Sequence, residues 1–221
     1  MTDGVAQRGC QTDDMKMIHA MFRREFSLAG PMVRNVAEGD VDKAIRVSGF
    51  LTQLVTGLHH HHHGEDTILW DTLVERSPAC AIHVGLMKEQ HAQVAALLEQ
   101  VDGLASTWTA AGSAESRDAL AAHFDVISAT LNDHLGQEEE NILPVATSSL
   151  YQHEWNRLGE EGLAAIPKNR RLVQLGYILE DATPEQRTDL LARVPAPARL
   201  LYKLIGRRQF EKERDSLRAP G

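Results

Sequence analysis

Apolar residues recur at three- and four-residue intervals along most of the chain, which is the spacing of one face of an α-helix. Short polar breaks at 39–40, 77–78 and 110–113 separate the long patterns from one another. The patterns predict four long helices, at about residues 12–38, 41–76, 78–109 and 114–144. Strand signals are almost absent. Because long helices joined by short turns become antiparallel neighbours, we expect an all-α fold, an up-down-up-down four-helix bundle.

Beyond Pro144 the helical pattern becomes shorter and more broken. Thr147 or Ser148 is expected to cap a helix that contains Leu150, and the proline-rich segment at 195–197 is expected to precede the last helix. We interpret this part as a C-terminal helical extension packed on the bundle. The predicted domains are residues 1–144 for the bundle with the metal site described below, and residues 145–221 for the extension.

The composition is that of an ordinary globular protein, with 43% hydrophobic and 24% charged residues among 221. This length supports one well-buried core and an extension. The formal charge of −8 argues against general binding to nucleic acid. No apolar stretch approaches the ~20 residues of a membrane span, so stable membrane insertion is not expected. With two cysteines, too few for a disulfide framework, and no secretory leader, the expected compartment is the cytoplasm.

The C-terminal tail carries a charge opposite to that of the rest of the chain. Seven basic and three acidic residues between 198 and 221 give the tail a charge of +4, whereas the rest carries −12. The tail also contains large apolar residues at helical spacing: Leu200, Leu201, Leu204, Ile205 and Phe210. We expect a docked amphipathic helix here, with contact to anionic lipid or an acidic partner as the alternative. The sequence indicates no particular protein partner.

A short pattern, histidine followed four residues later by two acidic residues, occurs twice and begins at His61 and at His134. In each copy the histidine stands one turn before a glutamate, Glu65 or Glu138. Residues four apart lie on the same face of a helix, so each copy directs an imidazole and a carboxylate toward one point. Two such helices that face each other can enclose two metal ions.

The other predicted helices also carry histidines, His19 on the first and His91 on the third. The candidate metal ligands are therefore His19, His61, Glu65, His91, His134 and Glu138. A single histidine–glutamate pair is more often a surface hydrogen bond, but the second copy favours metal. Nitrogen and oxygen donors without thiolate suit iron or manganese better than structural zinc, and two carboxylates can bridge two cations. We predict a centre of two iron ions.

Several neighbouring residues are left open as additional ligands. Asp66 and Glu139 directly follow the two glutamates, and either orient the imidazoles or coordinate metal themselves. The histidine run at 59–63 is interpreted as native, because it continues a helical pattern without a linker. His83, eight residues before His91, is expected to lie too far along and around the helix to share the site. The other members of the run are expected to face solvent or support the ligands: His59, His60, His62 and His63.

Four segments together resemble the hemerythrin-like, His-His-Glu cation-binding family. They are His19 with Arg23-Arg24-Glu25, the run from His60 to Trp70, Glu89-Gln90-His91, and His134 to Glu139 followed by Leu143-Pro144. The segments 154–159 and 195–202 resemble the extended actinobacterial members. The resemblance implies a non-haem diiron centre in a four-helix bundle that handles O₂, nitric oxide or peroxide, or that senses iron and oxygen.

One position departs from the oxygen-carrying members of that family. They place a second histidine four residues before the ligand on the third helix, and here that position is Met87. The missing imidazole leaves a metal position open or filled by water or a neighbour, which argues against simple reversible oxygen carriage. If the second helix deforms, one histidine of the run can substitute: His59, His60, His62 or His63.

The preferred hypothesis is a non-haem diiron protein that binds or reacts with a small oxidant or gas, namely O₂, nitric oxide or peroxide. The alternative is a sensor of iron, oxygen or redox state that signals through its C-terminal extension without turnover. In a third interpretation the cations only hold the bundle together. The chain contains no glycine-rich phosphate loop and no nucleophile elbow, so nucleotide-binding and hydrolase functions are not favoured.

Overall fold

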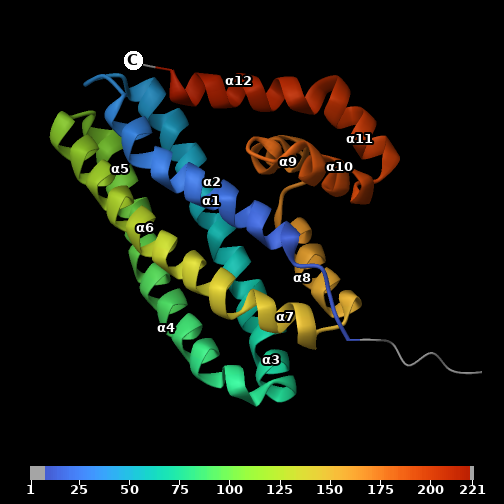
Figure 1. The fold of residues 1–221 in the computed structure, drawn as a ribbon. Coiled ribbons are helices and arrows are strands. Elements are labelled where there is room, and N and C mark those ends of the chain that lie inside the picture. Colours follow the sequence, from blue (N-terminus) through green and yellow to red (C-terminus); the bar gives the residue numbers. More distant parts are fainter. Residues whose placement is uncertain (1–7, 220–221) are drawn as a thin grey trace, which may run out of the picture.

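The computed structural model describes residues 8–219 and shows a helical protein, as the periodicity predicts (Figure 1). Within these residues, β-type pairing is limited to an isolated bridge between Gly9 and Tyr151. Up to residue 149 the helices are α1 (Asp13–Arg34), α2 (Val41–Gly64), the π-helix η1 (Glu65–Leu69), α3 (Trp70–Arg76), the 3₁₀ turn η2 (Pro78–Cys80), α4 (Ala81–Leu98), α5 (Val101–Ala111), α6 (Ala114–Asn141) and α7 (Leu143–Ser149). After it they are α8 (Gln152–Ala165), α9 (Arg171–Leu179), α10 (Pro184–Arg193), α11 (Ala196–Leu201), the π-helix η3 (Tyr202–Gly206) and α12 (Arg207–Arg218).

Four long rods form the bundle. The helix α1 packs against α2 and α6, and α4 with α5 packs against the same two helices, which closes a four-membered ring. Figure 1 shows these rods along the long direction of the molecule. Apolar side chains fill the space between them, and Phe26, Leu51 and Phe124 are almost completely buried. The predicted all-α fold, a four-helix bundle with further C-terminal helices, is confirmed.

Local capping interactions fix the helix ends that close the bundle. Asp40 caps α2 by accepting a hydrogen bond from the Lys43 amide at 3.0 Å, and Ser113 caps α6 by accepting from the Ser116 amide at 3.3 Å. Between α5 and α6, Gly112 has a φ of +63°, a left-handed conformation that ends a helix at little cost only for glycine. These turns place the ends of neighbouring rods side by side.

The second rod is not the single uninterrupted α-helix predicted from the sequence. Beyond Gly64 it continues as one π turn, in which the Trp70 amide donates to the Glu65 carbonyl five residues earlier. Such a turn is wider than an α turn and changes the direction of the side chains that follow. The third rod is also divided, into α4 and α5, and begins with the 3₁₀ turn at Pro78. The predicted second and third helices therefore cover approximately the right residues, but each is interrupted in the structure.

Helices α9 and α12 of the extension share the core of the bundle. Tyr177 of α9 lies near Phe50 of α2 and Phe210 of α12, with ring centroids 5.5 and 4.8 Å away. The close approach of α9 and α12 requires a glycine, because a Cβ on Gly176 would lie 2.4 Å from Cγ of Phe210. The extension therefore packs on the bundle through a continuous apolar contact. The division at residue 144 stays a prediction, and α7 crosses it.

Buried ion pairs also join α1 to the extension. Glu25 on α1 is 1% exposed, and its Oε1 accepts hydrogen bonds from Arg24 at 2.7 Å and from Arg218 of α12 at 2.8 Å. Both arginines also contact Glu180 at the end of α9, at 3.1 and 2.7 Å. Burial raises the pKa of Glu25 although Arg218 and Arg24 oppose the shift. The carboxylate therefore depends on both cations in this low-polarity environment.

The start of α8 differs from the prediction. The helix α7 already contains Thr147 and Ser148, so neither residue caps a following helix, and Leu150 lies between α7 and α8. The reason is a competing cap three or four residues later: the Glu154 side chain accepts from the Tyr151 backbone amide at 2.9 Å, so Tyr151 caps the helix and α8 begins at Gln152. Nothing in the spacing of apolar residues distinguishes these two starts.

The basic C-terminal helix docks by a different face from the one predicted. Phe210 is buried as expected, together with Tyr202, Gly206 and Leu217. The backbone at Gly206 approaches α9 so closely that a Cβ there would lie 2.8 Å from Cβ of Leu172. The other apolar residues predicted to dock are instead 58, 49, 57 and 46% exposed: Leu200, Leu201, Leu204 and Ile205.

Among residues 8–219, no helix is long and apolar enough to cross a membrane.

Candidate metal centre

Five histidines and two glutamates converge in the interior of the bundle, and each of the four rods contributes. They form two groups, within which the possible ligand atoms lie no more than 4.8 Å apart: a two-histidine group of His19, His61, Glu65 and Glu138, and a three-histidine group of His62, His91 and His134. All are buried except His61, whose side chain is 9% exposed. The structure thus brings together all six residues predicted as ligands and adds His62.

Each carboxylate lies near one imidazole of each group. The oxygen-to-Nε2 distances are 3.2 Å for Glu65 to His61, 3.4 Å for Glu65 to His91, 3.5 Å for Glu138 to His19 and 3.9 Å for Glu138 to His134. Glu65 uses a different oxygen toward each group, Oε1 toward one and Oε2 toward the other. A carboxylate placed in this way can bind two cations at once, one at each group of histidines.

The outer nitrogens of three histidines are held by oxygen acceptors. These are Glu139 for His19 at 2.9 Å, Asp66 for His91 at 2.8 Å and Gln90 for His134 at 3.1 Å. Arg23 donates to Glu139 at 2.6 Å, and the Trp70 indole donates to Asp66 at 2.7 Å. Burial opposes ionisation of Glu139, but hydrogen bonds from the histidine and Arg23 lower its pKa to about 2. Each acceptor keeps the proton on Nδ1 and directs the Nε2 lone pair inward.

These contacts favour the orienting role for the two residues that follow the glutamates. Asp66 and Glu139 lie on the outer side of the imidazoles, where they orient His91 and His19. Gln90 has the same position relative to His134 and was not anticipated. The amide of Gln90 is itself held, because its Nε2 donates to Oε1 of Gln137 at 3.0 Å. The only sequence signal for Gln90 is its place directly before His91.

Burial adjusts the protonation of the centre. Burial, followed by the neighbouring histidines, lowers the pKa of His61 and His62 well below the usual range and that of His134 to about 3. These imidazoles are therefore neutral at pH 7 and have a free lone pair. Burial, followed by the repulsion of Glu138, raises the pKa of Glu65 well above its usual range. A cation between the two carboxylates would remove this repulsion.

The inward ligand atoms have no hydrogen-bond partners within residues 8–219. They are nine in number, the Nε2 atoms of the five histidines and the four oxygens of the two glutamates. Buried polar atoms are normally paired, because each unpaired one costs about 1–3 kcal/mol. Here the unpaired lone pairs converge on the same space, and no thiolate is among them. This donor set fits one or two cations of the iron or manganese type.

His62 lies within the centre, beside the third-helix candidate ligand His91. Its ring stacks on His91 with centroids 4.1 Å apart, and it lies edge-on to His134 at 5.0 Å. Met87 is completely buried in an apolar cluster instead. Consecutive residues of an α-helix point about 100° apart, so the sequence could not place both His61 and His62 inward. His62 is therefore placed as in the alternative in which one histidine of the run substitutes for the missing imidazole, whereas His59, His60 and His63 are exposed.

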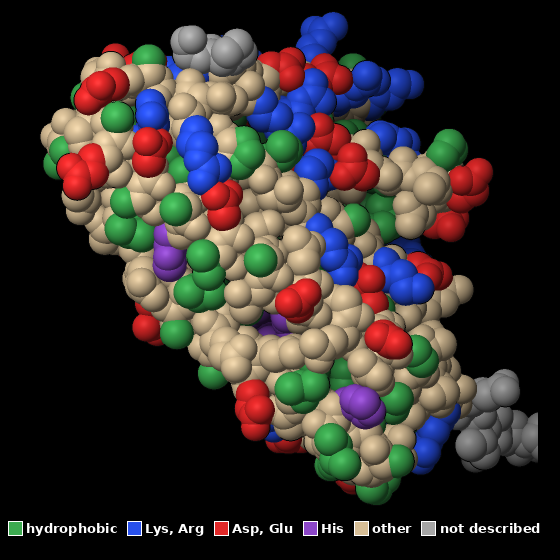
Figure 2. Space-filling model, turned by 60° about the vertical axis from the view of Figure 1, so that its left-hand side comes forward, with side chains coloured by type: hydrophobic (Ala, Val, Ile, Leu, Met, Phe, Trp, Pro, Cys, Tyr) green, Lys and Arg blue, Asp and Glu red, His purple; other side chains and the backbone are tan. Residues whose placement is uncertain are grey.

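The remaining histidines lie elsewhere. Four of them are exposed in the positions expected: His59, His60, His63 and His83. His123 pairs through Nε2 with the Leu97 carbonyl at 2.8 Å, and the exposed His153 stacks on Tyr151. On the face shown in Figure 2, histidine appears only in isolated places, one of them recessed. The centre is therefore enclosed by the bundle rather than displayed on its surface.

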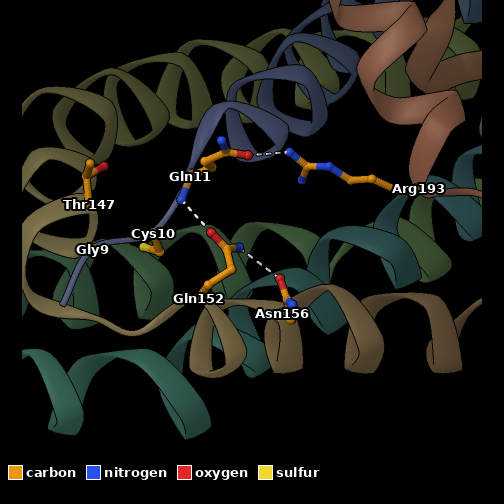
Figure 3. Close-up of a pocket in the computed structure, with 7 residues that line it drawn as sticks. All are labelled: Gly9, Cys10, Gln11, Thr147, Gln152, Asn156 and Arg193. Carbon is orange, nitrogen blue, oxygen red and sulfur yellow. Dashed lines mark hydrogen bonds between the residues drawn. The ribbon is translucent and has the colours of Figure 1, made fainter. Parts of the chain in front are cut away.

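A surface hollow beside α7 and α8 is separate from the centre (Figure 3). It is lined by Gly9, Cys10, Gln11, Thr147, Gln152, Asn156 and Arg193. Its polar groups form hydrogen bonds with one another. The backbone amide of Gln11 donates to the side-chain oxygen of Gln152 at 2.9 Å, and Arg193 donates to the side-chain oxygen of Gln11 at 3.0 Å. Burial raises the pKa of Cys10 to about 11, so its thiol stays protonated, as expected for an inert cysteine. The hollow contains no residue of the metal centre.

The protein is a four-helix bundle that directs neutral imidazoles and paired carboxylates into its interior, which is the arrangement of a metal-binding helical domain. A family model of the hemerythrin HHE cation-binding domain matches residues 10–146, more than half of the chain. The chain therefore belongs to the hemerythrin HHE cation-binding family. Comparisons with curated proteins and with solved structures found no match. The likeness of the later segments to actinobacterial members stays a prediction.

Proposed function

We propose that the protein is a non-haem diiron protein that binds or reacts with a small oxidant or gas, namely O₂, nitric oxide or peroxide. The observation that carries the proposal is the convergence of nine buried, unpaired donor atoms into two adjacent groups. A single ion would use only part of this set. Two nearby cations would repel each other, and Glu65 and Glu138, each of which lies near one imidazole of both groups, would offset that repulsion.

The donor count makes the two metal positions unequal. His62, His91 and His134 would hold one ion, and His19 and His61 would hold the other, with Glu65 and Glu138 shared. Because each carboxylate lies near one imidazole of each group, the three-histidine position would have one more protein donor than the two-histidine position. The two-histidine position would therefore leave more room for a further ligand, and we infer that the small molecule binds there.

The surroundings of that position favour a small ligand of low charge. The Phe22 ring lies 5.3 Å from the His61 ring, and Phe22 is 4% exposed. An apolar wall excludes water and disfavours a charged substrate. When bound, the iron ions supply Lewis-acid and redox chemistry toward the diatomic molecule or peroxide. The chain contributes the neutral imidazoles, the fixed Nδ1 protons and the enclosure.

The cytoplasm is the proposed compartment, because Cys10 and Cys80 are both unpaired thiols.

The experiment measures iron and ligand response in protein purified without added metal. We expect two iron ions per chain and a visible spectrum that changes when O₂, peroxide or nitric oxide is added. Turnover of the added molecule supports an enzyme, and a spectral change without turnover supports a carrier or sensor. Iron content near zero, or full iron with no response to any of the three molecules, contradicts the proposal.

A matched pair of variants tests the role of His62. We expect His62→Ala to lose about one of two iron ions, because the three-histidine position would retain only two imidazoles. His63→Ala is the control, since His63 is the next residue in the same run and is exposed. Equal iron contents in the two variants would show that His62 is not a ligand.

One observation favours the sensor as a second candidate. His19 and Glu25 lie on the same helix, and Glu25 pairs with Arg218 of α12. A shift of α1 on ligand binding would reach the extension through this pair. Hydrogen exchange of α12 with and without the ligand separates the candidates, because a sensor without turnover requires a ligand-dependent change in protection there.

A further inference from the structure

The C-terminal helix presents an exposed apolar surface that the diiron proposal does not use. It consists of side chains that are 46–58% exposed: Leu200, Leu201, Leu204 and Ile205. Leu200 with Leu204, and Leu201 with Ile205, are four positions apart, so each pair lies on one side of the helix and the two pairs form a broad adjoining strip. The opposite side, with Tyr202, Gly206 and Phe210, is buried against the rest of the extension. Large apolar residues gathered in this way mark an interaction site, whereas single exposed ones do not.

Basic side chains accompany these apolar residues. The exposed cations of the segment are Arg199, Lys203, Arg207 and Arg208, and residues 199–210 contain no acidic residue. Arg207 contacts Glu211 at 2.7 Å, one turn later. Figure 2 shows Lys and Arg side chains gathered at the top of the molecule, at the level of α12 in Figure 1. We call these four cations and the four apolar residues the apolar-basic face.

We propose that the apolar-basic face binds the surface of an anionic lipid bilayer, reversibly and without spanning it. Leucine and isoleucine side chains would enter the boundary between headgroups and acyl chains, while Lys and Arg would pair with the lipid phosphates. The charge of +4 in the tail, against −12 in the rest of the chain, orients the protein with this face toward an anionic surface.

The size and shape of the face favour lipid over a protein partner. From the exposures of its apolar residues the apolar area is roughly 400 Å², about half of the 800 Å² that each partner buries in a stable protein interface. The helix lies on the outside of the extension in Figure 1, and neither the hollow beside α7 and α8 nor the one between α3 and α4 includes its residues. Short apolar segments with nearby cations are typical of peripheral membrane contacts.

Co-sedimentation of the metal-loaded full chain with vesicles tests the proposal. One set of vesicles contains phosphatidylcholine alone, and the other contains equal parts of phosphatidylcholine and phosphatidylglycerol. We expect binding to the anionic vesicles, weaker by at least about tenfold on the neutral ones. Leu204→Glu should weaken the anionic binding by about fiftyfold or more, and Arg208→Gln by about fivefold.

Matched controls lie elsewhere on the surface. Ile82→Glu changes an isoleucine that is 84% exposed on α4, and Arg46→Gln removes an exposed cation on α2; neither should alter vesicle binding. Unchanged circular dichroism and iron content show that each variant is folded and test the metal centre separately from the membrane contact. Equal binding to neutral vesicles, or full binding by Leu204→Glu, would overturn the proposal. Dimerisation that Leu204→Glu abolishes, without vesicle binding, would assign the face to a second copy instead.

Discussion

The metal centre and the interface with the C-terminal extension bury charged or ionisable groups on the same helix in two different ways. His19 and Glu25 are six residues apart on α1 and are 0 and 1% exposed. Around Glu25 the chain supplies its own cations, Arg24 and Arg218. On the inward side of His19 the chain supplies only lone pairs and carboxylates, which have no partner within the described residues, while Arg23 pairs with Glu139 on the outer side.

This difference shows which buried polar cluster serves the fold and which requires a ligand. A buried carboxylate paired with arginine is compensated within the protein, although imperfectly, as the raised pKa of Glu25 indicates. A cluster of unpaired donors is costly until a cation binds, and binding then contributes to stability. The interface should therefore be insensitive to metal, whereas the centre should change in both stability and occupancy when the metal is removed.

The largest expected effect is the loss of a ligand at the centre. His134→Ala should weaken metal binding by about 100-fold or more, so that most iron is lost during purification. The helical content should persist, because the surrounding apolar core is unchanged. Metal analysis and circular dichroism measure the two quantities. His83→Ala is the control, since His83 is exposed on α4, and full iron content in His134→Ala would count heavily against the ligand set.

A smaller effect is expected from removing a cation at the interface. Arg218→Leu leaves Glu25 with one arginine, and should lower the free energy of unfolding by about 2 kcal/mol. Urea unfolding should show the same decrease in metal-loaded and metal-free protein, with iron content unchanged. A loss of iron in this variant would instead indicate that the interface and the centre are coupled, as the sensor candidate requires.

Helical spacing predicted the bundle and the two histidine–glutamate pairs that converge in it, whereas His19 and His91 were predicted as the histidines that the other two helices offer. A histidine and a glutamate four residues apart must share a face, wherever the helix lies, so His61 with Glu65 and His134 with Glu138 needed no tertiary information. His62 and Gln90 did need it. His62 is selected by the position of His91 on another rod, and Gln90 by the orientation of the His134 ring.

The extension was less predictable for a related reason. Two sides of the last helix carry apolar residues, and the side that docks is decided by how closely the backbone can approach α9. Gly206 permits that approach, so Tyr202 and Phe210 are buried while Leu204 is exposed. The spacing of apolar residues predicts which of them share a side of the helix, but not which side packs against another helix.

The smallest expected effect is that of Glu65→Gln on the free energy of unfolding. It separates the two regions most clearly, because the change should be positive without metal and negative with metal. In metal-free protein, Glu65→Gln removes one of two neighbouring buried carboxylates, and should raise the free energy of unfolding by roughly 1–2 kcal/mol. In metal-loaded protein the same variant should be less stable than the parent, since a neutral amide bridges two cations poorly and the stabilisation from bound metal falls.

Urea unfolding with chelator and with saturating iron measures both signs. Glu140→Gln is the matched control, because Glu140 is an exposed glutamate on α6 and its substitution should leave both forms unchanged. If Glu65→Gln destabilises the metal-free protein, the buried carboxylate must already be compensated by the chain, as Glu25 is. The centre would then resemble the interface, and the unpaired donors would no longer indicate a cation site.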